Sequence, residues 1–76
     1  MITQLDMDVL VAFAENGMVA SRVARQLFMH RNTVEYHLEK VKTKTGLDPR
    51  NLFHLAELLG VEVVINKKEV ESEWAT

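Results

Sequence analysis

The sequence contains no cysteine, and only one proline and three glycines occur among its 76 residues. Without cysteine, neither a disulfide nor a zinc site built on thiolates can form. No apolar run approaches the roughly 20 residues of a membrane-spanning helix, and the first residues lack the basic and apolar regions of a secretory signal. We therefore expect a small cytoplasmic protein, or a cytoplasmic domain of a longer one.

The chain also has little net charge, but its charges are unevenly distributed. Residues 1–21 and residues 51–76 each carry a net charge of −3, whereas residues 22–50 carry seven basic against three acidic side chains. A basic segment of this kind is typical of a surface that meets phosphate, although a solvated helical surface gives the same pattern. A chain this short is too small for a large catalytic cleft with a cofactor domain.

Apolar periodicity and well-placed glycines predict four helices. Each is expected to end near a glycine or a turn, and the expected spans are 3–16, 21–28, 31–45 and 48–59, with Asp48 as the last N-cap and Pro49 at the first helical position. Asp6 is an alternative cap to Thr3 for the first helix, and Val19 or Ala20 are alternative starts for the second. The third has Asn32 as an alternative start and Lys44 as an alternative end. We expect an all-α fold in which residues 1–60 form the four-helix domain. Apolar residues at every second position over 61–65 predict a short strand. This strand belongs to a C-terminal segment, 61–76, whose last residues are mostly polar.

The second and third expected helices meet the physical requirements of a helix-turn-helix. Ala24 is small where the two helices touch, and Met29 places an apolar side chain in the turn. Val34 recurs with Leu38 and Val41 as a buried stripe along the third helix. Phe28 occupies the turn position where many such motifs have glycine.

The string His30-Arg31-Asn32-Thr33-Val34, followed by Thr45-Gly46-Leu47-Asp48-Pro49, resembles the C-terminal helix-turn-helix of the PucR/CdaR group of bacterial regulators. The spacing is also similar to that of LuxR/GerE-type domains. The resemblance covers roughly residues 5–60. It implies a four-helix domain of a transcriptional regulator that binds double-stranded DNA, often as a dimer.

The third helix is expected to enter the major groove. Four residues on or near the face opposite its buried stripe are candidates for base contacts: Asn32, Glu35, Tyr36 and Glu39. Four others are suited to phosphate contacts: Arg22, Arg31, Thr33 and Lys40. Asn32 and Thr33 have an alternative role as caps of the helix, and Arg31 and Lys40 have one as solvated charges.

Glu35 and Glu39 depart from the resemblance, because the related regulators usually have arginine or lysine at these positions. A carboxylate can accept a hydrogen bond from cytosine, but it also repels phosphate. Neither glutamate is expected to find a good partner on its own helix, since position 43 is threonine and Lys40 lies five residues after Glu35. The alternative function is therefore a helix-turn-helix that binds another protein.

The fourth helix has more apolar surface than a small monomer needs to bury. We expect a homodimer interface that includes Leu52, Leu55 and Leu59, together with Val63 of the expected strand. Alternatively, the C-terminal segment covers this surface within a monomer. The spacing of the three histidines gives no metal site, no catalytic arrangement is apparent, and neither enzymatic activity nor a cofactor is expected.

Overall fold

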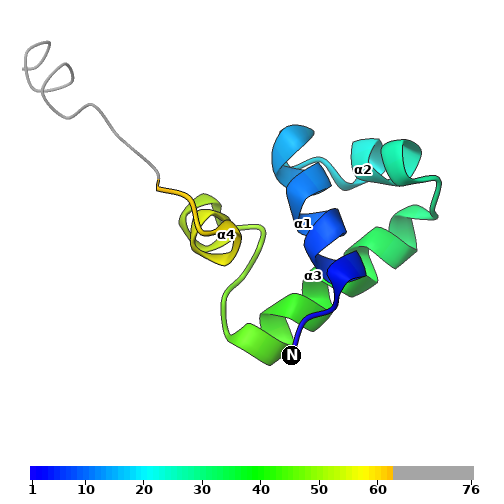
Figure 1. The fold of residues 1–76 in the computed structure, drawn as a ribbon. Helices are drawn as coiled ribbons and strands as arrows, with labels where there is room; N and C mark the ends of the chain where they lie inside the picture. The colour runs from blue at the N-terminus through cyan, green and yellow to red at the C-terminus, as the bar shows by residue number, and fades with distance from the viewer. Residues whose placement is uncertain (63–76) are drawn as a thin grey trace, which may run out of the picture.

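A computed structural model describes residues 1–62, which form four α-helices and no strand (Figure 1). In chain order these are α1 (Gln4–Glu15), α2 (Ala20–Leu27), α3 (Arg31–Thr45) and α4 (Leu52–Leu59). The predicted all-α, four-helix fold is therefore confirmed. Of the expected strand over 61–65, Val61 and Glu62 are not in a strand, and the remainder lies outside the described residues.

α1 begins with a reciprocal cap between Thr3 and Asp6. The Thr3 hydroxyl accepts from the Asp6 backbone N–H at 3.2 Å, and the Asp6 carboxylate accepts from the Thr3 N–H at 2.8 Å. This capping box satisfies two backbone donors that have no partner within the helix. The arrangement draws the Asp6 side chain inward, where it is completely buried.

α2 begins at Ala20, so the alternative start is correct and Ser21 is not the cap. The helix ends at Phe28, which has a left-handed backbone (φ 54°) and a 96% exposed side chain. This conformation lets the Met29 N–H donate to the Ala24 carbonyl at 3.0 Å and turns the chain toward α3. Phe28 thus adopts the backbone that glycine usually provides, at a steric cost.

α3 has the predicted length, but its N-cap is His30. The His30 Nδ1 accepts from the Asn32 N–H at 3.0 Å. Capping is therefore not the role of the Asn32 or Thr33 side chain, and both are exposed. The helix ends at Gly46, which is left-handed (φ 76°) as the sequence predicts.

The start of α4 differs from the prediction, because Asp48-Pro49 forms a turn and not the first turn of the helix. The Asp48 carbonyl accepts from the Asn51 N–H at 2.9 Å, and the Asp48 carboxylate accepts from the Arg50 N–H at 3.0 Å. Asn51 is the actual cap, and its side chain accepts from the backbone N–H groups of Phe53 and His54. Proline suits the second position of such a turn as well as the first of a helix.

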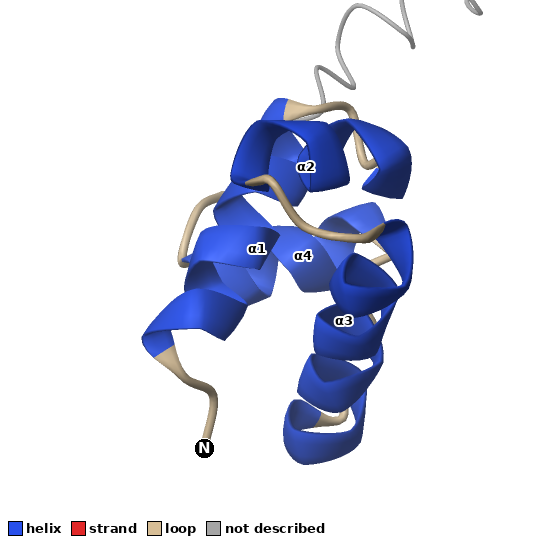
Figure 2. Cartoon of the chain, turned by 90° about the vertical axis from the view of Figure 1, so that its right-hand side faces the viewer, coloured by secondary structure: helices blue, strands red, loops and turns tan. Residues whose placement is uncertain are grey.

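The helices share one apolar core. α1, α2 and α3 pack against one another, and α4 packs against α1; Figure 2 shows α2 above α1 and α3, with α4 behind. The core contains residues from all four helices: Val9, Leu10, Ala12, Phe13, Val23, Val34, Leu38, Val41 and Leu55. Among the described residues, every buried side-chain nitrogen and oxygen has a hydrogen-bond partner.

Candidate nucleic-acid interface

α3 buries one face and leaves the opposite one in solvent. Val34, Leu38 and Val41 are at most 1% exposed, which fixes the rotation of the helix about its axis. On the opposite side Asn32, Tyr36, Glu39 and Thr43 are exposed. This face and the first turn of α3 define the candidate interface, and the structure brings three of the four predicted base-contacting residues together on it.

Basic and polar groups surround the N-terminus of α3. Arg31 and Thr33 are exposed in its first turn, and Arg22 is exposed on α2. The α3 helix dipole adds a partial positive charge at the same place, although the Asn32 N–H is already capped by His30. Three of the four predicted phosphate-contacting residues are therefore accessible, and two of them, Arg31 and Thr33, lie at this end of α3.

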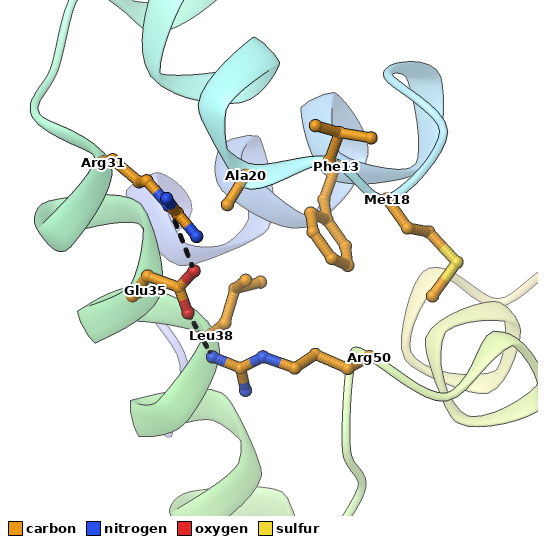
Figure 3. Close-up of a pocket in the computed structure, with 8 residues that line it drawn as sticks. Phe13, Met18, Ala20, Arg31, Glu35, Leu38 and Arg50 are labelled. Atoms are coloured by element: carbon orange, nitrogen blue, oxygen red, sulfur yellow. Dashed lines mark hydrogen bonds and ion pairs between the residues drawn. The ribbon is translucent and has the colours of Figure 1, made fainter.

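Glu35 lies at the edge of the candidate interface and is held by two arginines. The Arg50 Nη2 atom lies 2.6 Å from its Oε2 atom, and the Arg31 Nε atom lies 3.8 Å from its Oε1 atom (Figure 3). Arg50 also contacts Glu39, with 3.4 Å between Nη1 and Oε2. The hydrogen bond to Glu35 raises the pKa of the Arg50 guanidinium above its usual value, against the effect of partial burial.

The prediction that neither glutamate has a good partner on its own helix is therefore wrong for Glu35, which pairs with Arg31, whereas the partner of Glu39 comes from outside α3. For Arg31 the signal was present in the sequence, because it precedes Glu35 by four residues, the spacing of a helical ion pair. For Arg50 no sequence pattern was available. It follows Glu35 by 15 residues, and it reaches α3 only because the Asp48-Pro49 turn directs it there.

Beside these ion pairs lies a hollow of about 360 Å³. Its apolar wall comes from α1, the α1–α2 turn, the start of α2 and α3, with Phe13, Met18, Val19, Ala20 and Leu38. Its charged rim comes from Arg31, Glu35 and Arg50 (Figure 3). Since Glu35 already pairs with both arginines, the rim has little unpaired charge to offer a small ligand.

Lys40 is not directed toward solvent as a phosphate contact requires. Its Nζ atom lies 3.1 Å from the Asp6 Oδ2 atom, and its side chain is only 20% exposed. The other oxygen of Asp6 accepts from the His37 Nδ1 atom at 2.6 Å. Burial alone raises the pKa of the Asp6 carboxyl, but the Thr3 backbone and then the two side-chain partners outweigh burial and hold that pKa well below its usual value.

The residues predicted for a dimer interface do not share one exposed surface. Leu52 is 52% exposed, and its neighbour Phe53 is 56% exposed. Leu55, in contrast, is 2% exposed within the core of its own chain, so its assignment to an interface is wrong. Leu59 is partly buried against the same core, and Val63 lies outside the described residues.

Within residues 1–62, no group of three or more histidine or acidic side chains is placed to bind a metal ion. No helix in the same part of the chain is long and apolar enough to cross a membrane.

The order of the helices, the turn at Phe28 and the exposed face of α3 define a helix-turn-helix domain. Residues 6–61 match the family model of the PucR C-terminal helix-turn-helix domain, and the chain belongs to this family. Neither a curated protein nor a solved structure matches the chain. Family membership indicates a DNA-binding domain of the kind found in transcription regulators, and the LuxR-like spacing remains a prediction.

Proposed function

We propose that this domain binds double-stranded DNA in the cytoplasm by placing α3 in the major groove, and that it regulates transcription as a homodimer. Residues 1–60 form the DNA-binding unit, and the family match over residues 6–61 supports this boundary. The proposal rests on the exposed face of α3, where Asn32 and Tyr36 lie beside the basic first turn of the helix. The proposed role is non-enzymatic.

Base recognition is assigned to the outer face of α3. Asn32 has the paired donor and acceptor that recognise adenine, and Tyr36 offers an aromatic ring for a thymine methyl group or a hydroxyl for a phosphate. Glu39, whose side chain is 62% exposed, can accept from the amino group of cytosine. Glu35 contributes only at the edge of the contact, because both of its oxygens already face arginines.

Phosphate binding is assigned to the side chains of Arg22, Arg31 and Thr33, together with the partial positive charge at the N-terminus of α3. We assign Lys40 a structural role, because its ammonium group pairs with the buried Asp6 carboxylate. This division differs from the sequence prediction, in which Lys40 belonged to the phosphate-contacting set.

The experiment is a titration of labelled duplex DNA with the folded protein at several salt concentrations. We expect affinity to fall steeply with salt, and Arg31→Ala to reduce the slope of log K against log salt by about one unit. Glu57→Gln, on the exposed part of α4, is the control and leaves the slope unchanged. Absence of binding at low salt by the folded protein would overturn the proposal.

The homodimer is proposed on the exposed apolar residues at the start of α4. Leu52 and Phe53 are more than half exposed there, and Leu59 extends the apolar character of the helix. Helix-turn-helix dimers bind two half-sites about one DNA turn apart, so dimerisation would supply affinity that a small domain lacks alone. Sedimentation of the protein over a range of concentrations tests this, and a monomer at every concentration excludes it.

The alternative function, binding to another protein through an acidic α3, has less support than the sequence suggested. Its basis was the unpaired charge expected on Glu35 and Glu39, and both of these side chains contact Arg50.

A further inference from the structure

Arg50 lies outside the helix-turn-helix, in the turn between α3 and α4, but its side chain extends to α3. Its two terminal nitrogens contact different carboxylates, Nη2 that of Glu35 and Nη1 that of Glu39. One guanidinium therefore bridges two glutamates one helical turn apart. The side chains of Arg50 and Glu35 are each 37% exposed, so the pair is accessible at the border of the candidate interface.

We propose that Arg50 is a positioning residue for DNA binding, which offsets the charges of Glu35 and Glu39 and holds the Glu35 carboxylate at the side of α3, away from the phosphates. This inference rests on the proposed function, since it concerns the same surface. Arg50 acts through the two glutamates, and the ligand is the polyanionic backbone of duplex DNA.

The charge balance on α3 supports this role. Without a partner, Glu35 would place a negative charge at the border of the candidate interface on α3, and Glu39 would place one on its outer face. Repulsion between these charges and the phosphates opposes DNA binding. Arg50 and Arg31 together bring the local charge of this group to zero, and the short contact to Glu35 directs that carboxylate to the side of the helix. Arginine is suited to this task, because the separate N–H donors of its planar guanidinium can reach two carboxylates at once.

The energetics also favour a role in binding over a role in folding. Ion pairs between partly exposed side chains contribute little to folding stability, because water screens them and their side chains lose entropy. The same charges act strongly on a polyanion that approaches the helix, since like charges brought together at an interface are costly. Loss of Arg50 should therefore weaken DNA binding more than it destabilises the fold.

A double-mutant cycle distinguishes this role from direct contact between Arg50 and a phosphate. The measured quantity is the affinity for a labelled duplex at low salt, for Arg50→Gln in the natural background and in a Glu35→Gln/Glu39→Gln background. If Arg50 acts through the glutamates, Arg50→Gln lowers affinity about tenfold in the first background and less than about twofold in the second. If Arg50 contacts phosphate itself, the loss is equal in both, and the proposal is overturned.

Arg25→Gln serves as the matched control. This change also removes one positive charge, from the exposed Arg25 side chain on α2. In the described structure, no ion pair joins Arg25 to either glutamate. Its effect, whatever its size, should be the same in both backgrounds. Thermal unfolding of every variant is measured in parallel, and a melting temperature of Arg50→Gln close to that of the natural protein is expected.

The outcomes separate this inference from the proposed function. If the natural protein does not bind duplex DNA, the proposed function itself fails. If it binds and the Arg50→Gln effect is unchanged in the glutamine background, the proposed function stands and only the role of Arg50 is wrong.

Discussion

Asp6 and His37 are 31 residues apart in the chain, yet an Asp6 carboxylate oxygen lies 2.6 Å from the His37 Nδ1 atom in the interior of the domain. The second oxygen accepts from Lys40, so a single buried carboxylate joins the start of α1 to the middle of α3. A buried carboxylate without such partners would be strongly unfavourable. This contact therefore fixes how α1 lies against α3, the proposed recognition helix.

The first prediction concerns acid stability. The pKa of Asp6 is lower in the folded protein than in the unfolded chain, so the carboxylate stabilises the fold above the unfolded pKa of 3.8. This stabilisation is lost as the pH falls below about 4, because protons then bind preferentially to the unfolded chain. In urea unfolding experiments, the free energy of unfolding should fall between pH 7 and pH 2, and it should fall less for Asp6→Asn than for the natural protein.

At pH 7 the same variant should be less stable by about 2–4 kcal/mol, since it removes one member of a buried charged cluster. Asp8→Asn is the control, because Asp8 is exposed on the same helix and, within residues 1–62, its side chain accepts only from Gln4. A pH profile of Asp6→Asn as steep as that of the natural protein would contradict the prediction.

The second prediction separates Lys40 from Arg31. Lys40→Met should lower the free energy of unfolding by about 1–2 kcal/mol, because it removes the charged partner of the buried Asp6 Oδ2 atom, which then keeps the Thr3 N–H. The same change should leave the salt slope of DNA binding unaltered. If Lys40→Met instead reduces that slope by about one unit without loss of stability, then Lys40 contacts a phosphate, as the sequence suggested.

The third prediction concerns the turn between α2 and α3. Phe28→Gly should stabilise the domain by about 0.5–1 kcal/mol, because relief of the left-handed conformation exceeds the added entropy of the unfolded chain. The 96% exposed ring contributes almost no burial that could be lost. Phe28→Ala keeps the strained backbone and should change stability by less than about 0.5 kcal/mol. If the Phe28→Gly variant is less stable than the Phe28→Ala variant, this explanation is wrong.

The fourth prediction distinguishes the two sides of α4. Leu55→Ala should cost about 2–4 kcal/mol of folding stability, because the side chain fills the core. Leu52→Ala should change stability by less than about 0.5 kcal/mol, since the residue is half exposed. Under the proposed dimer, Leu52→Ala weakens self-association in sedimentation, and an unchanged association constant would remove this residue from the interface.

Local signals in the sequence were sufficient for most of the fold. The Val34, Leu38 and Val41 stripe gave the orientation of α3, and the glycines marked three helix ends. The start of α4 was predicted three residues too early, because Asp and Pro favour both a helix start and a turn. Asn51 decided between these two structures, since its side chain caps two backbone N–H groups.

The candidate site was less predictable, because its electrostatics depend on tertiary contacts. The exposure of Asn32 and Tyr36 follows from helical periodicity alone. The partners of Lys40 and Glu35 do not, because Asp6 and Arg50 come from distant parts of the chain. The burial of Leu55 was missed for a similar reason, since an apolar helix does not reveal which side faces the core.

The origin of Arg50 in the α3–α4 turn has a consequence for protein engineering. A helix-turn-helix transplanted into another scaffold would normally comprise α2, its turn and α3, that is residues 20–45. Such a graft would keep Glu35 and Glu39 but leave behind the arginine that contacts both of them. A functional chimera therefore needs the donor segment extended through Asn51.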